Sequence, residues 1–208
     1  MSKSMKMWML AAILILSGMS MVGCKNKTGD SAKQPLDKTQ AEAQAEARRK
    51  AFDMNQCLKT VDDYLVNVIG KQYTQGDVCI PYNYLISTDN GNLDDILVWG
   101  DFYVFNYELS DNTLKTVSGG NHPGLMHVKQ TDNGYEVVAF DVVEDGAGNL
   151  ESAKRIFGRK FDSYQEICGL QEKREEIRLQ LTADYVKAHG LSATMLQDYG
   201  RPAVALPQ

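Results

Sequence analysis

Three side chains that alternate along one apolar segment are the residues of this sequence best suited to chemistry. Trp99, Asp101 and Tyr103 lie two positions apart, so on a β-strand all three point to the same face of a sheet. A carboxylate beside a phenol suits proton abstraction, with Asp101 as the base and Tyr103 as the donor to a developing oxyanion. The alternative is a structural face, in which Asp101 is hydrogen-bonded at a bend beside Gly100 and the aromatic rings belong to the core. We favour this structural interpretation and assign no catalytic residue.

A second candidate is the glycine-rich stretch 118–124, which lies between two strand patterns where a shorter turn would suffice. As a ligand-binding lip it would expose the amides of Gly119 and Gly120 to an anion and offer His122 as a donor or acceptor near neutral pH. The alternative, which we favour, is a bulge that bends one long strand and uses the conformational freedom of glycine.

His122 and His127 raise the question of a metal site. Five positions on an uninterrupted strand send the two rings to opposite faces, so a shared metal would need a bulge and a carboxylate from Asp141 or Glu144. We therefore predict no metal and no cofactor.

The N-terminus has the order of features of an export signal. Lys3 and Lys6 precede an apolar run at 8–16, and small residues then lead to Cys24. A positive start, a short apolar stretch and a small residue at the cut are what a signal peptide requires. This order predicts export, cleavage before Cys24 and a lipid anchor.

Residues 21–24, Met-Val-Gly-Cys, resemble the lipobox of bacterial lipoproteins, in which cysteine follows a small residue and becomes the first mature residue. The resemblance implies that residues 1–23 are the signal peptide. It also implies that Cys24 carries diacylglycerol on its sulfur and an acyl chain such as palmitate on its amine, which gives stable residence in a membrane. The implied location is the bacterial cell envelope, at the outer membrane or facing the periplasm. An uncleaved signal anchor is the alternative, but the apolar run is short for a bilayer span.

Charge and length limit what the mature protein does. Cleavage removes 23 of the 208 residues and leaves 185, enough for one domain, and removing two lysines changes the net charge from −5 to −7. An acidic chain is a poor partner for nucleic acid. Residues 24–40 are polar without periodicity and predict the lipidated cysteine followed by a flexible tether.

Hydrophobic periodicity predicts a single α+β domain over 41–190. A helix is expected over 41–69, with Leu58, Val61, Leu65 and Val68 as its apolar stripe. Period-two and aromatic segments then predict strands, and helical segments return near the C-terminus. The strands are expected at 78–87, 96–109, 113–118, 125–130 and 135–143, and the helices at 150–157 and, interrupted near Gly169, at 162–189. Residues 191–208 are expected to be a helical turn and a tail.

This order predicts an N-terminal helix packed on a curved antiparallel meander of four to five strands, with the C-terminal helices on the same side. It resembles the cystatin-like and nuclear-transport-factor-2-like (NTF2-like) folds as an order of elements only, and the C-terminal helices depart from the second family. The Gln-x-Val-x-Gly loop of cystatin inhibitors is absent from the sequence, so protease inhibition does not follow.

Three cysteines remain once Cys24 is lipidated, so at most one disulfide forms within the chain. Cys57 and Cys168 lie in apolar helical segments where a reduced thiol packs as a small hydrophobe, which we favour. A bridge from Cys79 to either helix stays open.

The sequence therefore predicts a lipid-anchored envelope protein whose domain is a non-catalytic module for a small ligand or an envelope protein. Trp99, Asp101, Tyr103, Gly119, Gly120 and His122 are its candidate ligand-binding residues. The alternatives are an isomerase or cyclase of NTF2-like type, using a cavity on the sheet face, and a structural protein that docks through its acidic C-terminal helices.

Overall fold

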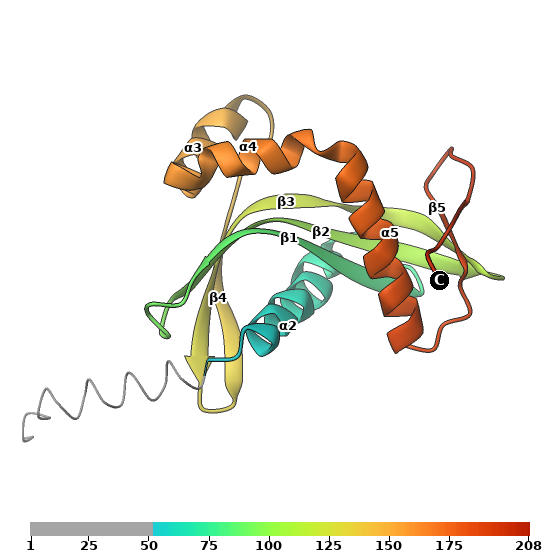
Figure 1. The fold of residues 1–208 in the computed structure, drawn as a ribbon, viewed down its shortest axis with the longest axis horizontal. Helices are drawn as coiled ribbons and strands as arrows, with labels where there is room; N and C mark the ends of the chain where they lie inside the picture. Colours follow the sequence, from blue (N-terminus) through green and yellow to red (C-terminus); the bar gives the residue numbers. More distant parts are fainter. Residues whose placement is uncertain (1–51) are drawn as a thin grey trace, which may run out of the picture. The chain divides into compact units, whose positions relative to one another are not determined.

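A curved sheet forms the centre of the fold in the computed structural model, which describes residues 52–208 (Figure 1). Strands β1 (Val78–Asp89), β2 (Ile96–Ser110), β3 (Thr113–Thr131) and β4 (Gly134–Val142) pair with their sequence neighbours as an antiparallel meander. Strand β1 lies at one edge, which suits Pro81 because proline cannot donate to a ladder. The α+β meander expected from the sequence is confirmed. The predicted signal peptide, Cys24, the tether and residues 41–51 of the expected helix lie outside the described residues.

Strand β3 is long enough to take a different partner at each end. Its C-terminal part pairs with β4, while its first three residues pair in parallel with β5 (Met195–Gln197), and β6 (Val204–Ala205) pairs with β5. The sheet is therefore mixed. Residues 191–208, expected as a helical turn and a tail, contribute these two strands because Leu196 and Leu206 are buried in the core.

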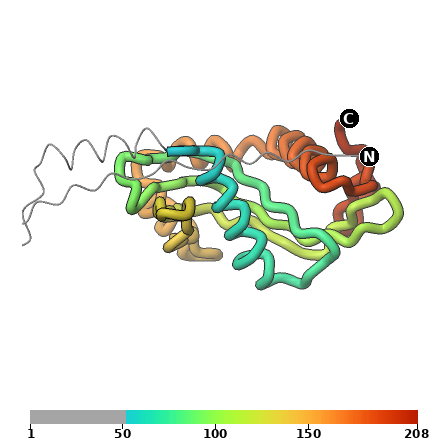
Figure 2. The backbone as a smooth tube through the Cα atoms, turned by 90° about the horizontal axis from the view of Figure 1, so that it is seen from below, coloured from blue at the N-terminus to red at the C-terminus, as the bar shows by residue number. Residues whose placement is uncertain are grey.

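One face of the sheet is covered by helix α2 (Met54–Tyr64), onto which Figure 2 looks. Asp53 caps the helix by accepting hydrogen bonds from the first-turn amides. Cys57, Val61, Leu65 and Ile69 pack against the even-numbered side chains of β2.

Val68, the last residue of the predicted apolar stripe, is not buried. A π-helical turn, η1 (Leu65–Ile69), continues α2 and runs into the 3₁₀ turn η2 (Gly70–Gln72). The wider turn buries Ile69 and leaves Val68 43% exposed.

The opposite face of the sheet is covered by the C-terminal helices α3 (Asn149–Phe157), α4 (Phe161–Gly169) and α5 (Gln171–Ala188), with short turns η3 (Gly146–Gly148) and η4 (Gly158–Lys160). The helical segments and the interruption near Gly169 are confirmed. Their expected position on the same side as α2 is wrong, because odd-numbered β2 residues such as Trp99 and Tyr103 pack against them while even-numbered ones pack against α2. Within residues 52–208, no helix has both the length and the apolar character needed to span a bilayer.

Candidate functional site

The alternating trio on β2 shares one face, as its spacing predicts, but only two of its members meet. The Tyr103 hydroxyl donates to Asp101 Oδ2 at 3.0 Å. Trp99 instead donates through Nε1 to the carbonyl of Ile156 at 3.0 Å, and the Lys160 ammonium lies 3.8 Å above its ring. Trp99 is therefore a contact between the sheet and the α3–α4 region.

Asp101 is completely buried and its two oxygens are engaged. Besides the Tyr103 bond, Oδ2 accepts from Arg174 Nη1 at 3.1 Å, and Oδ1 accepts from the Asn121 amide at 3.4 Å. The same Arg174 nitrogen donates to the Tyr103 hydroxyl at 2.6 Å. Burial raises the pKa of the Asp101 carboxyl, and the hydrogen bonds from Tyr103, Asn121 and Arg174 oppose that rise. The Asp101 carboxylate therefore forms a closed polar cluster with these three donors.

Arg178, one helical turn after Arg174 on α5, is buried. Arg178 Nη1 and Nη2 bind the two oxygens of Asp198 at 2.9 and 2.8 Å, and Nη2 also donates to the Tyr107 hydroxyl at 3.1 Å. Its guanidinium carbon lies 4.5 Å from the centre of the Phe105 ring. These bonds tie α5 both to the sheet and to the segment between β5 and β6.

Arg174, Arg178 and Asp198 were not predicted from the sequence. The apolar Leu181 of this helix is 37% exposed, whereas the buried positions are Arg178, Thr182 and Val186. The i, i+4, i+8 spacing of these three positions is the only sequence signal of the buried face of α5. It is not an apolar pattern, because Arg178 and Thr182 are polar.

The glycine stretch lies within strand β3 rather than in a loop. One extra residue, Val117, bulges opposite Asn106 and Tyr107, and Gly119 follows with φ of +147°, a conformation that favours glycine. A Cβ at Gly120 would stand 2.6 Å from the Tyr73 hydroxyl. The glycines therefore serve backbone geometry and close packing.

His122 faces the α2 side of the sheet, away from Asp101. Its Nε2 is 2.9 Å from the Tyr73 hydroxyl, and burial lowers the pKa of its ring. The six candidate ligand-binding residues are thus divided between opposite faces of the sheet and do not converge on one site.

His127 lies on the face opposite His122, as the five-residue spacing predicts. Its Nδ1 is 2.7 Å from Asp95 Oδ1 and its Nε2 is 3.6 Å from Asp141 Oδ2. Among the described residues, no three histidine, cysteine or acidic side chains are grouped to hold a metal ion.

The cysteines of the described region, Cys57, Cys79 and Cys168, are all unbridged. Burial raises the pKa of the Cys57 thiol to about 11. This thiol is therefore protonated at neutral pH and packs as an apolar group, as the favoured interpretation holds.

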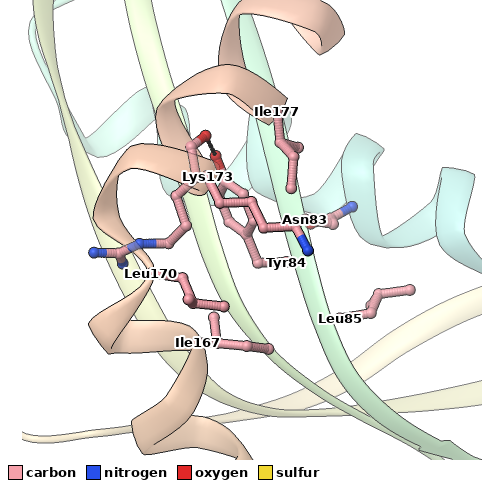
Figure 3. A pocket seen from close by; sticks show the side chains of 8 residues that line it. Asn83, Tyr84, Leu85, Ile167, Leu170, Lys173 and Ile177 are labelled. Atoms are coloured by element: carbon pink, nitrogen blue, oxygen red, sulfur yellow. Dashed lines mark hydrogen bonds between the residues drawn. The ribbon is translucent and has the colours of Figure 1, made fainter.

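Two cavities flank the contact between α5 and the sheet. One of about 210 Å³ lies between the polar side chains of α5 and the aromatic side chains of β1 and β2, and Tyr103 and Phe105 are among its lining residues. The other, of about 280 Å³, lies beside the edge strand β1, under Ile167, Leu170 and Ile177 (Figure 3). Tyr84 and Arg174 line both cavities.

A carboxyl–amide pair joins α2 to β1 close to the second cavity. The Asn83 amide donates to Asp62 Oδ1 at 2.5 Å, while Asn83 Oδ1 is buried without a partner. Burial raises the pKa of Asp62 from 3.8 to about 6, with a smaller contribution from Asp63, and the bond from Asn83 and the charge of Lys59 oppose the rise.

We expect Asp62→Asn to stabilise the protein near neutral pH. The folded state holds the Asp62 proton more tightly than the unfolded chain, so the free energy of unfolding rises as pH falls through about 6 toward 3.8 and is lower above that window. The variant carries no charge to bury, and its gain at pH 7 should be at most about 3 kcal/mol. Urea unfolding of both proteins at several pH values measures the difference. Asp63→Asn, at the neighbouring exposed position, is the control, and an equal gain there would contradict the assignment to Asp62.

Comparison with known proteins gives this chain no relatives: no family model, no curated protein and no solved structure matches it.

Proposed function

We propose that this protein is a lipoprotein anchored through Cys24 to the bacterial envelope, and that its domain is a non-catalytic module that binds a small ligand or another envelope protein. The anchor rests on the order of lysines, apolar run and Met-Val-Gly-Cys at the N-terminus. The polar residues 25–40 would then hold the domain near the membrane surface without placing it in the bilayer.

The observation that carries the non-catalytic assignment is the burial of Asp101. A general base must come within hydrogen-bond reach of the proton that it removes. Asp101 has no exposed surface, and Tyr103, Arg174 and Asn121 occupy its oxygens. Asp101 does not line either of the two cavities beside this cluster. This arrangement favours binding over proton transfer.

A small-molecule isomerase or cyclase of NTF2-like type is the second candidate. The 3.0 Å contact between Tyr103 and Asp101, beside a cavity that Tyr103 lines, is the observation in its favour. In this alternative, Arg174 would have to leave Asp101 for a substrate to reach the carboxylate.

Cys24→Ser is expected to release the protein from the membrane. Lipoprotein processing needs the thiol of Cys24 as the acceptor of diacylglycerol, and serine offers none. Fractionation of a bacterial host, together with incorporation of labelled palmitate, should show membrane-bound, labelled wild-type protein and an unlabelled variant. Cys168→Ser, which alters a half-buried thiol of the domain, is the matched control and should stay labelled. Equal labelling of Cys24→Ser and wild type would overturn the anchor.

A further inference from the structure

We propose that the cavity beside β1 binds a small monocarboxylate with an aliphatic or aromatic body. This inference rests on the domain being a binding module and names the ligand class of one site. It does not depend on the anchor at Cys24.

The walls of this cavity are apolar and partly uncovered. Leu85 from β1, Ile167 and Leu170 from the α4–α5 junction, and Ile177 from α5 surround it (Figure 3). Leu85 is 37% exposed and Leu170 is 41% exposed, so large aliphatic surfaces face solvent on both sides of the opening. Adjoining apolar side chains with this exposure are typical of a binding surface.

Most polar atoms near the wall have partners elsewhere, and two that have none, Asn83 Oδ1 and Arg174 Nε, are buried away from the surface. The Tyr84 hydroxyl donates to the Arg174 carbonyl at 2.6 Å, which is the dashed line in Figure 3. The Arg174 guanidinium donates to Asp101 Oδ2 at 3.1 Å. The Asn83 amide donates to Asp62 on α2. The body of a ligand in this cavity therefore meets hydrocarbon and an aromatic ring.

Lys173 supplies the one charge at this cavity that no described residue neutralises. Its side chain extends over Tyr84 toward β1, and its ammonium forms no ion pair or hydrogen bond within residues 52–208. The other cation of the lining, Arg174, is paired with Asp101 at 3.1 Å. An anionic group at the mouth would pair with Lys173, whereas a ligand ammonium would be repelled.

Size and charge together select the ligand class. A volume of about 280 Å³ is at the lower end for ligand cavities, so the body is small. A carboxylate with one short apolar tail or one ring satisfies both the wall and Lys173. A neutral molecule of the same shape gains the apolar contact only.

Three matched probes test this proposal: 4-fluorophenylacetate, 2-(4-fluorophenyl)ethanol and 2-(4-fluorophenyl)ethylamine. Their ¹⁹F line widths would be measured with the protein as purified from a bacterial host, in phospholipid nanodiscs if it carries lipid and in buffer if it does not, with empty nanodiscs as the blank for membrane partition. The acid should bind more tightly than the alcohol, and the amine most weakly. Lys173→Gln should weaken acid binding by about two- to fivefold, the range of an exposed ion pair, and leave alcohol binding unchanged.

Two further variants separate the apolar and charged contributions. Leu170→Gln, at an exposed position of the wall, should abolish binding of acid and alcohol alike. Lys187→Gln, in the last turn of the same helix, should change neither. Acid and alcohol binding equally, or an unchanged acid affinity in Lys173→Gln, would overturn the carboxylate assignment, and no binding of any probe would overturn the site. Membrane fractionation of Cys24→Ser decides the anchor separately, so failure here does not imply failure there.

Discussion

Replacing Arg178 with methionine is expected to lower the free energy of unfolding by about 3–5 kcal/mol, the range found when one partner of a buried ion pair is removed. Methionine keeps most of the apolar stem but none of the donors. Asp198 loses both hydrogen bonds from the guanidinium, and the buried Tyr107 hydroxyl loses one. Since Asp198 keeps 29% side-chain exposure, water can hydrate it, which favours the lower end of the range.

Thermal and urea unfolding measure this effect. For a domain of this size the melting temperature should fall by roughly 10 °C. Arg155→Met is the control, because Arg155 and Glu144 form an ion pair at 3.4 Å with both side chains more than half exposed, and its loss should cost at most about 1 kcal/mol. Equal losses for the two variants would mean that the Arg178 cluster contributes no more than a surface pair.

The fold could be predicted because its strands and most of its helices carry strong local signals. β2 is dense in β-branched and aromatic side chains, and the Asp-Asn-Gly turn before β4 is a strong hairpin signal. The apolar stripe of α2, which continues into η1, shows a period of 3.6 through Val61 and Leu65. These signals depend only on neighbours in the chain.

The arrangement in space was harder to predict because periodicity does not say which face of a sheet a helix covers. The apolar spacing of the C-terminal helices carries no information about which side of the meander they cover. β5 and β6 were missed because each is too short to show a period, and their pairing depends on the distant first residues of β3. A parallel pair between segments 82 residues apart has no local signature.

In the candidate site, too, the features set by neighbouring residues could be predicted and the contacts between distant segments could not. That Trp99, Asp101 and Tyr103 share a face follows from strand geometry alone. Which groups surround Asp101 depends on Arg174, which is 73 positions away on α5. A partly buried arginine in a helix with many charged residues looks like part of a solvated surface. The sequence therefore predicted a hydrogen-bonded Asp101 but not the arginine that is among its partners.

Asp101→Asn is the second substitution expected to have a large effect, a loss of about 2–4 kcal/mol. Asparagine has nearly the same shape, but it leaves the Arg174 guanidinium, whose side chain is only 21% exposed, without its anion. Both oxygens of Asp101 accept hydrogen bonds. In asparagine one of them is replaced by an NH₂ group, which is a donor and would face the donors that the carboxylate oxygen accepted from. Chemical denaturation measures the loss, and Asp94→Asn, which breaks an exposed 3.9 Å pair with Lys129, is the matched control. The pair Asp101→Leu with Arg174→Met should recover part of the stability because it removes both buried charges together.

The same variant separates the two candidate functions. If Asp101 is a structural residue, Asp101→Asn loses stability, and any ligand binding at the β1 cavity persists wherever the variant is folded. If Asp101 is a general base, a turnover found for the wild-type protein disappears in Asp101→Asn at temperatures where circular dichroism shows an intact fold. A variant as stable as the wild type that has also lost such a turnover would contradict the closed cluster and establish the enzyme. Since Arg174 binds both Asp101 and Tyr103, we expect the loss of stability instead.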